Sequence, residues 1–417
     1  MGQCADDEKQ NEVLRNVANL CYRCKKCAVI CPVATSGHFN PRKFISEVNI
    51  EAPARAKQGK AFYDTEEDPW WCLTCGACKI CPQGLDIPEI VREIRGEMRG
   101  ESPSNPRFLA TETHLNIFPT AFEIMAKNPN PAPKANILKK YAAAHNWPEP
   151  QMKQSGTISY YPGCINLCEN ALVNVDVPQT RTGYAVVRFL NLAGIEPVVV
   201  NDYCCGHDAL WAGDDETFCI FARRNVKIWK EAGIKTLITS CSEGYRTLSV
   251  DYPRFLPDFP FQVEFAPDYF DRNHLFENIE GLEFRQRTTV TIHDPCRSGR
   301  LVGGGHYESA RNLLRKVYSL KIVEMPNNRD DAKCCGVSAF RNCTDFARDL
   351  TRDRIREAMQ VGAEYLITTC PKCLSHFQCV IQNEAVELQR QVGREVPKVM
   401  DLFSFLHTIY VENGEAS

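Results

Sequence analysis

The sequence has no run of about 18 apolar residues, the length that a helix needs to cross a bilayer. Its longest apolar stretches, such as residues 197–200, have the length of strands. The first residues, MGQCADDEKQNEVLRN, are polar and acidic and do not resemble a secretory signal. Asp6 stands where a myristoylation signal needs Ser or Thr. We therefore expect a cytoplasmic protein without a transmembrane helix of its own.

An excess of basic charge is also missing. The 417 residues contain 49 Lys+Arg and 52 Asp+Glu, which gives a net charge of −3. Nucleic-acid-binding domains usually carry a clear basic excess, so no nucleic-acid partner is expected. A flavin fingerprint is absent as well, and the glycines at 303–305 lack the spacing and the Lys-Ser/Thr of a phosphate loop.

Cysteine, in contrast, is abundant, with 22 residues in an otherwise ordinary globular composition of 44% hydrophobic and 24% charged residues. The length suggests two or three domains. Disulfides, zinc sites and iron–sulfur clusters could each explain so many cysteines. Because a cytoplasmic protein keeps its thiols reduced, metal is the leading explanation.

Two cysteine runs lie in the first hundred residues, and each ends in Cys-Pro. The first is C-x2-C-x2-C-x3-C and the second is C-x2-C-x2-C-x2-C; together they comprise Cys21, Cys24, Cys27, Cys31, Cys72, Cys75, Cys78 and Cys81. Three thiolates at x2 spacing can wrap one cubane, and the fourth cysteine can reach a second one. We predict two [4Fe–4S] clusters, with Cys31 and Cys81 exchanged between them. Zinc, which usually needs separated C-x2-C pairs, and disulfides fit this pattern less well.

The segments around these runs read as helical. Asn40-Pro41 begins one amphipathic stretch and Pro88 opens another, as first-turn prolines do. The spacing favours a helical two-cluster ferredoxin domain over residues 1–102. Residues 103–154 are rich in proline and lack cysteine, so they are interpreted as a linker that packs between domains.

From residue 155 the chain repeats itself. Residues 236–241 align with 365–370 at an offset of 129, and the Cys-Cys-Gly at 204–206 aligns with 334–336 at an offset of 130. Each copy reads as strands that end in cysteine loops, with helices between them (221–231 and 346–359). Alternating strands and helices predict a parallel sheet with the cysteine loops at one edge. The copies span 155–285 and 286–417, so the fold class is α+β multidomain: a helical ferredoxin domain followed by two repeated α/β cysteine-rich domains.

The two copies differ in their number of thiols. The second supplies five: Cys296, Cys334, Cys335, Cys370 and Cys373. The first supplies four: Cys164, Cys204, Cys205 and Cys241. Gly244 stands where the fifth would be, and Cys168 or Cys219 could substitute for it. Cysteine also serves as a small core hydrophobe, but the recurrence at a nearly fixed offset favours metal binding.

The two cysteine patterns, in this order, resemble a fusion of the C and B subunits of heterodisulfide reductase, whose repeats are called CCG domains. The resemblance covers residues 10–100 and 155–405. It implies that Cys296, Cys334, Cys335, Cys370 and Cys373 bind a catalytic non-cubane [4Fe–4S] cluster, to which two ferredoxin-type cubanes conduct electrons. Gly244 puts paired-cluster cleavage of a disulfide in doubt, so a cubane, a relay or an altered site is expected in the first copy.

Each of the other residues near these motifs has two possible roles. His207, His293 and His376 could donate to cluster sulfur, or be structural histidines. Arg297 and Arg300 could attract an anionic thiol substrate, or stabilise an anionic cluster. Cys4, Cys343 and Cys379 belong to no motif and are expected to be free thiols.

These observations predict an iron–sulfur oxidoreductase subunit that acts on a disulfide/dithiol couple. The alternative is an electron relay within a larger complex, with no substrate of its own. The family resemblance implies a membrane cytochrome b or a flavin subunit as the partner. The protein would then lie peripherally on the inner face of the membrane.

Overall fold

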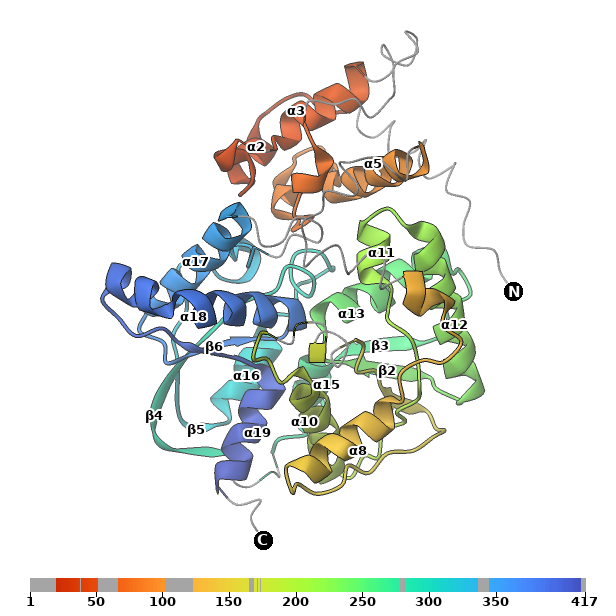
Figure 1. The fold of residues 1–417 in the computed structure, drawn as a ribbon, viewed down its shortest axis with the longest axis vertical. Helices are drawn as coiled ribbons and strands as arrows, with labels where there is room; N and C mark the ends of the chain where they lie inside the picture. The colour runs from red at the N-terminus through yellow and green to blue at the C-terminus, as the bar shows by residue number, and fades with distance from the viewer. Residues whose placement is uncertain are drawn as a thin grey trace.

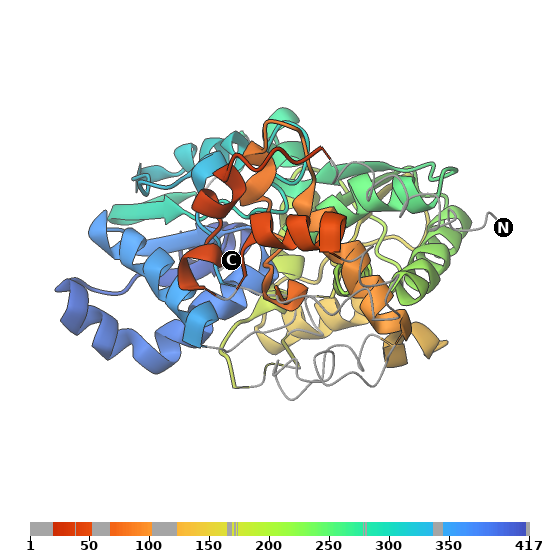
Figure 2. The same cartoon turned by 90° about the horizontal axis from the view of Figure 1, so that it is seen from above.

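A computed structural model describes residues 20–37, 39–51, 67–101, 123–164, 169–170, 172, 174–277, 279, 282–336 and 345–413. A helical N-terminal part lies above two sheet-containing halves that stand side by side (Figure 1). Seen from above, this part lies across the two halves (Figure 2). Within the described residues, no helix is both long and apolar enough to cross a membrane.

The N-terminal part consists of short helices around the two cysteine runs. They are α2 (Lys26–Ile30), α3 (Pro41–Ser46) and α5 (Ile87–Glu101). Asn40 begins α3 as expected, because its side chain accepts hydrogen bonds from the backbone nitrogens of Arg42 and Lys43. The apolar face of α5 is buried against the first half, so this part is packed onto the rest of the chain.

The proline-rich segment is packed where the structure describes it. It contains helix α8 (Lys134–Ala144), whose first residue, Lys134, forms a buried ion pair with Asp202 of the first copy. The hydroxyl of Tyr203 donates to the carbonyl oxygens of Asn128 and Pro129, each at 3.0 Å. Residues 123–154 are therefore held against the first copy.

The first copy is built on a parallel sheet in the order β1-β2-β3, formed by β1 (Ile158–Tyr160), β2 (Thr236–Thr239) and β3 (Gln262–Phe265). Val198 adds a parallel bridge on the free side of β1. The helices of this copy are α10 (Gln179–Leu192), α11 (His207–Trp211), α12 (Asp215–Glu231), α13 (Ser242–Arg246), α14 (Tyr252–Phe255) and α15 (Ala266–Arg272).

The second copy has a parallel sheet in the order β5-β4-β6-β7, formed by β4 (Glu283–Ile292), β5 (Tyr318–Ile322), β6 (Tyr365–Thr368) and β7 (Lys398–Asp401). Its helices are α16 (Glu308–Arg315), α17 (Asp345–Gln360), α18 (Pro371–Val392) and α19 (Leu402–Asn413). The spatial order matches that of the first copy, with the bridge at Val198 in the place of β5.

The repeat in the sequence is therefore a repeat in the fold. The backbone nitrogen of Tyr161 donates to Ile238 at 2.8 Å, and at the equivalent place His293 donates to Ile367 at 2.8 Å. Each copy forms its own sheet, and each adds a last strand, β3 or β7, that the cysteine pattern did not predict because no cysteine follows it. The copies meet where β2 and β6 end, and there Ser242 donates from its backbone nitrogen to Thr369 at 3.2 Å.

Candidate metal centres

The eight N-terminal cysteines form two sets in the crossed arrangement that their spacing predicts. Thiol group 1 is Cys21, Cys24, Cys27 and Cys81. Burial raises the pKa of Cys27 to about 11, and the other three thiols of this group add to the shift. Thiol group 2 is Cys31, Cys72, Cys75 and Cys78. Burial raises the pKa of Cys31 to about 12, with Cys72 and Cys75 adding to it. Each run thus places its last cysteine beside the other run.

The shorter spacing of the second run is accommodated by a tighter helix. Cys27 and Cys31 are separated by one turn of the α-helix α2, which has 3.6 residues per turn. Cys78 and Cys81 are separated by one turn of a 3-10 helix over Ala77–Ile80, which has 3.0 residues per turn. The backbone nitrogen of Cys81 donates to Cys78 at 3.1 Å in that turn. The spacing between Cys78 and Cys81, shorter by one residue than that between Cys27 and Cys31, therefore does not prevent Cys81 from reaching group 1.

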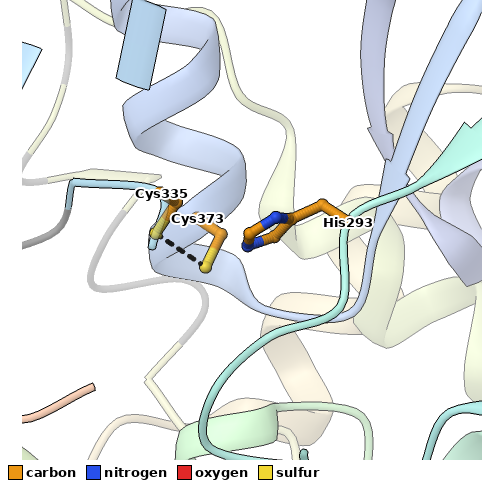
Figure 3. A group of neighbouring side chains, drawn as sticks. All are labelled: His293, Cys335 and Cys373. Carbon is orange, nitrogen blue, oxygen red and sulfur yellow. Dashed lines mark hydrogen bonds between the residues drawn. The ribbon is translucent and has the colours of Figure 1, made fainter. Parts of the chain in front are cut away.

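Thiol group 3 gathers the five cysteines of the second copy. Cys296 follows β4, Cys334 and Cys335 lie in the loop after β5, and Cys370 and Cys373 stand at the start of α18. The sulfurs of Cys335 and Cys373 are 3.0 Å apart (Figure 3). Hydrogen bonds with Cys335 and Cys370, together with burial, raise the pKa of Cys373 well above its usual value. The sequence repeat thus predicts a real cluster of thiols.

Thiol group 4 gathers the four cysteines of the first copy. Hydrogen bonds with Cys164 and Cys205, and then burial, raise the pKa of Cys204 well above its usual value. Burial raises the pKa of Cys241 well above its usual value, and Cys370 of group 3 is the next cause. Gly244 donates from its backbone nitrogen to the Cys241 sulfur at 3.3 Å, so a backbone N–H stands where group 3 has a fifth thiol.

Of the two cysteines considered as replacements, only Cys219 lies in the part of the chain that the structure describes. Cys168 lies outside the described residues, as do Cys4 and Cys343. Cys219 is buried on α12 and is disulfide-bonded, so it does not offer a free thiol to group 4. Cys379 lies on α18 as a free thiol, as expected.

Glycine is required beside both cysteine pairs. Gly206 and Gly336 have φ values of 83° and 85°, in the left-handed region that disfavours side chains. A Cβ atom on Gly336 would lie 2.2 Å from the carbonyl oxygen of Ala347. The Cys-Cys-Gly turn can therefore lie directly against the helix that follows it.

The four groups follow one another in space. A hydrogen bond between the thiols of Cys75 and Cys334 is the first cause of the raised pKa of Cys75, so group 2 touches group 3. Cys370 raises the pKa of Cys241, as described above, so group 3 adjoins group 4. The resulting order is 1, 2, 3 and 4, and it crosses from the N-terminal part through the second copy to the first.

The donor set fits iron–sulfur clusters. All seventeen side chains of the four groups are thiols, and burial and mutual proximity hold many of them protonated in the absence of metal. When metal binds, the thiols lose their protons, and the positively charged metal ions take the place of these protons among the packed sulfurs. Four or five thiolates suit a [4Fe–4S] cluster, whereas tetrahedral zinc would leave one thiol of group 3 unused.

Comparisons with known proteins agree with this geometry. Residues 17–85 match the 4Fe-4S dicluster domain, and residues 158–249 and 290–378 each match the cysteine-rich domain called CCG. The chain carries a ferredoxin-type dicluster domain and two CCG domains. It is a distant homologue of the D subunit of heterodisulfide reductase and of related iron–sulfur proteins.

Three relatives show the range of this homology. The D subunit of the dihydromethanophenazine:CoB–CoM heterodisulfide reductase of Methanosarcina mazei is 25% identical, over 85% of this chain and 86% of its own length. A probable membrane-anchored ferredoxin of Chromohalobacter salexigens is 24% identical, over 91% of this chain and 59% of its own. The B subunit of the fumarate reductase (CoM/CoB) of Methanothermobacter marburgensis is 24% identical, over 94% and 72%. The chain is thus an iron–sulfur protein with oxidoreductase subunits among its homologues.

His293 of the second CCG domain lies beside thiol group 3. One of its ring nitrogens and the sulfurs of Cys335 and Cys373 lie within 4.8 Å of one another, and the ring points at that pair (Figure 3). Arg354 donates from Nε to His293 Nδ1 at 3.1 Å. Burial and then Arg354 lower the pKa of His293 well below its usual value, so the neutral ring carries its proton on Nε2.

The other two histidines have different partners. His207 Nδ1 lies 3.1 Å from the hydroxyl of Thr247, and its Nε2 lies 3.5 Å from Glu243. His376 Nδ1 lies 3.4 Å from the hydroxyl of Thr351. These contacts favour the structural interpretation of His207 and His376.

The two arginines join the dicluster domain to the second CCG domain. Arg297 is buried and donates from Nη2 to the hydroxyl of Thr74 at 2.7 Å. Arg300 donates from Nε to the carbonyl oxygen of Cys75 at 2.8 Å. Both oppose the burial that raises the pKa of Cys296 to about 12. These contacts favour stabilisation of negative charge on the thiol groups over capture of an external anion.

Arg95 is a functional residue that the sequence reasoning missed. It is fully buried and donates to the carbonyl oxygens of Cys72 at 2.7 Å, Pro69 at 2.8 Å and Trp211 at 2.9 Å. It therefore ties the loop of thiol group 2 to the first CCG domain. No sequence pattern singles it out, because other charged side chains of α5, among them Glu89, Arg92 and Glu93, are buried as well.

Proposed function

We propose that this protein is an electron-transferring iron–sulfur subunit in which thiol groups 1 and 2 hold two [4Fe–4S] cubanes and thiol group 3 holds a non-cubane [4Fe–4S] cluster. Clusters held in these places would supply one-electron transfer. The observation that carries the proposal is the continuous series of thiol groups, joined by the contact of Cys75 with Cys334 and by the proximity of Cys241 to Cys370.

We propose a disulfide/dithiol couple as the substrate class. Its reduction is RSSR + 2e⁻ + 2H⁺ → 2 RSH, so the electrons must be delivered one at a time to a site that binds sulfur. Thiol group 3, the catalytic set of this proposal, supports this choice with five cysteines, against four in each other group, and with adjacent Cys334 and Cys335. The name of the Methanosarcina mazei relative supports the same class of substrate.

The protein's own residues hold and shield this site. Arg297 and Arg300 keep the dicluster domain in place against the second CCG domain and bring positive charge to group 3. His293 offers an N–H to the sulfurs of that group, because Arg354 occupies its other nitrogen. Four of the five thiols in group 3 are buried, which excludes water from the sulfurs.

One observation favours a second function, an electron relay with no substrate of its own. At Gly244 the first CCG domain has a backbone N–H in place of a thiol, so the two CCG domains cannot act as an equal pair on the two sulfurs of a disulfide. Thiol group 4 would then hold a cubane or an altered cluster. That cluster would either end the series of thiol groups or pass electrons onward.

We propose a membrane cytochrome b or a flavin subunit as the partner. The name of the membrane-anchored relative supports a place at the membrane. The protein would then lie peripherally on the inner face of the membrane.

The deciding experiment uses the full chain purified without oxygen. Iron and sulfide are quantified, and oxidation of reduced viologen is followed with a small disulfide. A reductase consumes viologen in proportion to the disulfide added, whereas a relay becomes reduced and then stops. Colourless or zinc-containing protein would contradict both functions.

A matched pair of variants locates the substrate site. Cys373→Ser removes one thiol of group 3 and should abolish disulfide-dependent turnover and the EPR signal of the non-cubane cluster. Cys379→Ser lies on the same helix outside every group and should change neither. An unchanged non-cubane signal in Cys373→Ser would refute the assignment of group 3.

A further inference from the structure

The loops around thiol groups 1 and 2 carry a concentration of exposed apolar side chains. Ten large hydrophobic side chains are exposed among the described residues, and five of them come from the loops around groups 1 and 2: Leu20, Tyr22, Val29, Ile30 and Ile80. Tyr22 is 57%, Val29 79% and Ile80 53% exposed. Such a concentration of exposed apolar side chains is typical of an interaction site.

These side chains border two hollows. Val29, Ile30 and Ile80 line the first, together with Lys79 and the thiols of Cys31 and Cys75 in group 2. Tyr22 lines a second hollow with Arg23 and Lys25, and the thiols of group 1 form part of that wall. We call the surface made by Tyr22, Val29, Ile30, Ile80, Arg23, Lys25, Lys26 and Lys79 the group 1 face.

The charged side chains on the two loops that form this face have one sign. Residues 20–37 and 72–85 contain Arg23, Lys25, Lys26 and Lys79 and no acidic residue, although the whole chain has a net charge of −3. All four basic side chains are exposed. The first hollow is also lined by three carboxylates of the second CCG domain, Asp330, Asp331 and Asp353. Basic side chains of the face lie at the second hollow, where Arg23 and Lys25 stand beside group 1.

Exposure of the sulfurs points to the same place. Cys24 of group 1 is the one exposed thiol among the free cysteines that the structure describes, whereas nearly all thiols of groups 3 and 4 are buried. An electron exchanged with another protein must reach a redox group close to the surface. Group 1 is the outermost of the series, and it lies at the end away from group 4.

We propose that the group 1 face is the docking site of an electron-carrying protein with an acidic surface. The inference rests on the proposed function, because it assumes a redox group at thiol group 1. Each encounter moves one electron: the reduced carrier loses it and the oxidised protein gains it, with no bond made or broken. The basic residues steer the carrier, and the apolar residues hold it.

A charge-reversal experiment tests the proposal on the iron-loaded full chain. The probe is a reduced plant-type ferredoxin, a small acidic [2Fe–2S] protein, and its oxidation is followed by stopped flow at low salt. In the triple variant Lys25→Glu, Lys26→Glu, Lys79→Glu we expect the rate constant to fall by about tenfold or more, and its dependence on salt to flatten. Each rate is divided by the iron content per chain, which corrects for cluster content.

The matched control is Lys140→Glu, Lys230→Glu, Lys235→Glu, which makes the same change in net charge at exposed lysines of the first CCG domain and of α8. It should keep the normalised rate within about twofold. An equal loss in both triple variants would show that only net charge matters and would overturn the proposal.

The apolar half of the face has its own test. Val29→Ser, Ile30→Ser, Ile80→Ser should weaken saturation by the ferredoxin while leaving the salt dependence of the rate intact. If the group 1 lysines instead govern sedimentation with phosphatidylserine vesicles and leave the ferredoxin rate unchanged, the face binds a membrane surface and the proposal is wrong.

The outcomes also separate this inference from the proposed function. If the protein carries iron and turns over a disulfide but the lysine variant reacts normally with ferredoxin, the docking site alone is refuted. If the protein binds no iron, both the docking site and the proposed function are refuted.

Discussion

Arg300 donates from Nε to the carbonyl oxygen of Cys75 at 2.8 Å, which fixes thiol group 2 against the domain that holds thiol group 3. The same guanidinium donates from Nη1 to the carbonyl oxygens of Asp330 at 2.7 Å and Ala332 at 2.8 Å, just before the Cys334-Cys335 pair. One side chain from the second CCG domain therefore sets the positions of the two loops where those groups meet.

Replacing Arg300 with Gln should destabilise the protein, because partly buried carbonyl oxygens lose a charged donor. We expect a cost of about 2 kcal/mol and a fall of about 3 °C in the Tm of the anaerobic holoprotein. Arg300→Lys should lie between wild type and Arg300→Gln, since an ammonium group cannot match the planar fork. Arg390→Gln removes an exposed pair with Glu387 and should leave the Tm unchanged. Equal effects of Arg300→Gln and Arg390→Gln would contradict this account.

Gly244→Cys should give the first CCG domain a fifth thiol. A Cβ atom at this position would lie 3.4 Å from the Cβ of Cys241 and 3.8 Å from its sulfur, which is ordinary contact, and the backbone there needs no glycine. We expect a second EPR signal of the non-cubane type and more iron per chain. Gly244→Ser has nearly the same size without the soft sulfur ligand, and it should bring neither change. A new signal in the serine variant would assign the effect to packing instead.

Gly336→Ala should be far more harmful than an alanine at another left-handed glycine. The added methyl group would collide with the carbonyl oxygen of Ala347, in addition to the cost of a positive φ. Together we expect a loss of about 3 kcal/mol or more, with loss of iron from thiol group 3. Gly393→Ala tests the backbone cost alone, because its φ is 71° and nothing lies within 4 Å of the added atom. Its expected cost is about 1 kcal/mol, measured as the change in Tm of both variants.

Asp401 should make folding stability depend on pH. Burial raises its pKa to about 7, although the backbone nitrogens of Phe403 and Ser404 donate to it at the start of α19. Its pKa in the unfolded chain is about 3.9, so the folded state binds this proton more tightly. The contribution to stability is full in acid and is lost as the pH rises through 7.

Asp401→Asn keeps the cap and stays neutral, so its stability relative to wild type should increase between about pH 5.5 and pH 8. The buried neighbour Tyr160 has a pKa raised by burial and stays protonated throughout this range. Urea unfolding at the two pH values measures the difference. A constant difference between wild type and variant would show that Asp401 is ionised in the folded protein.

Several features of this protein could be predicted from residue patterns because the physics behind them is local. The x2 and x3 cysteine spacings correspond to single helical turns, so the eight N-terminal thiols could be divided into two crossed sets. The repeat at a nearly fixed offset implied two similar sheets, since equal patterns of strands and helices pack in equal ways. Asn40-Pro41 predicted the start of α3, because a cap needs only the nearest backbone nitrogens.

Other features depended on residues far apart in the chain. The contact of Cys75 with Cys334 joins positions more than 250 residues apart, and no sequence pattern in either segment predicts it. The same holds for Arg95, one of several charged residues of α5, because its three carbonyl partners come from two distant segments of the chain. The last strand of each sheet also escaped prediction, because no cysteine marks where it ends.

The amino-acid sequence by itself determined which sulfurs belong to each group, since the spacing of the cysteine runs and the repeated strand ends are local patterns. Only the tertiary structure decided the order of the groups, which of them meets solvent, and which arginines join them. Those properties arise from how the domains pack, and packing is the sum of many weak contacts between distant segments.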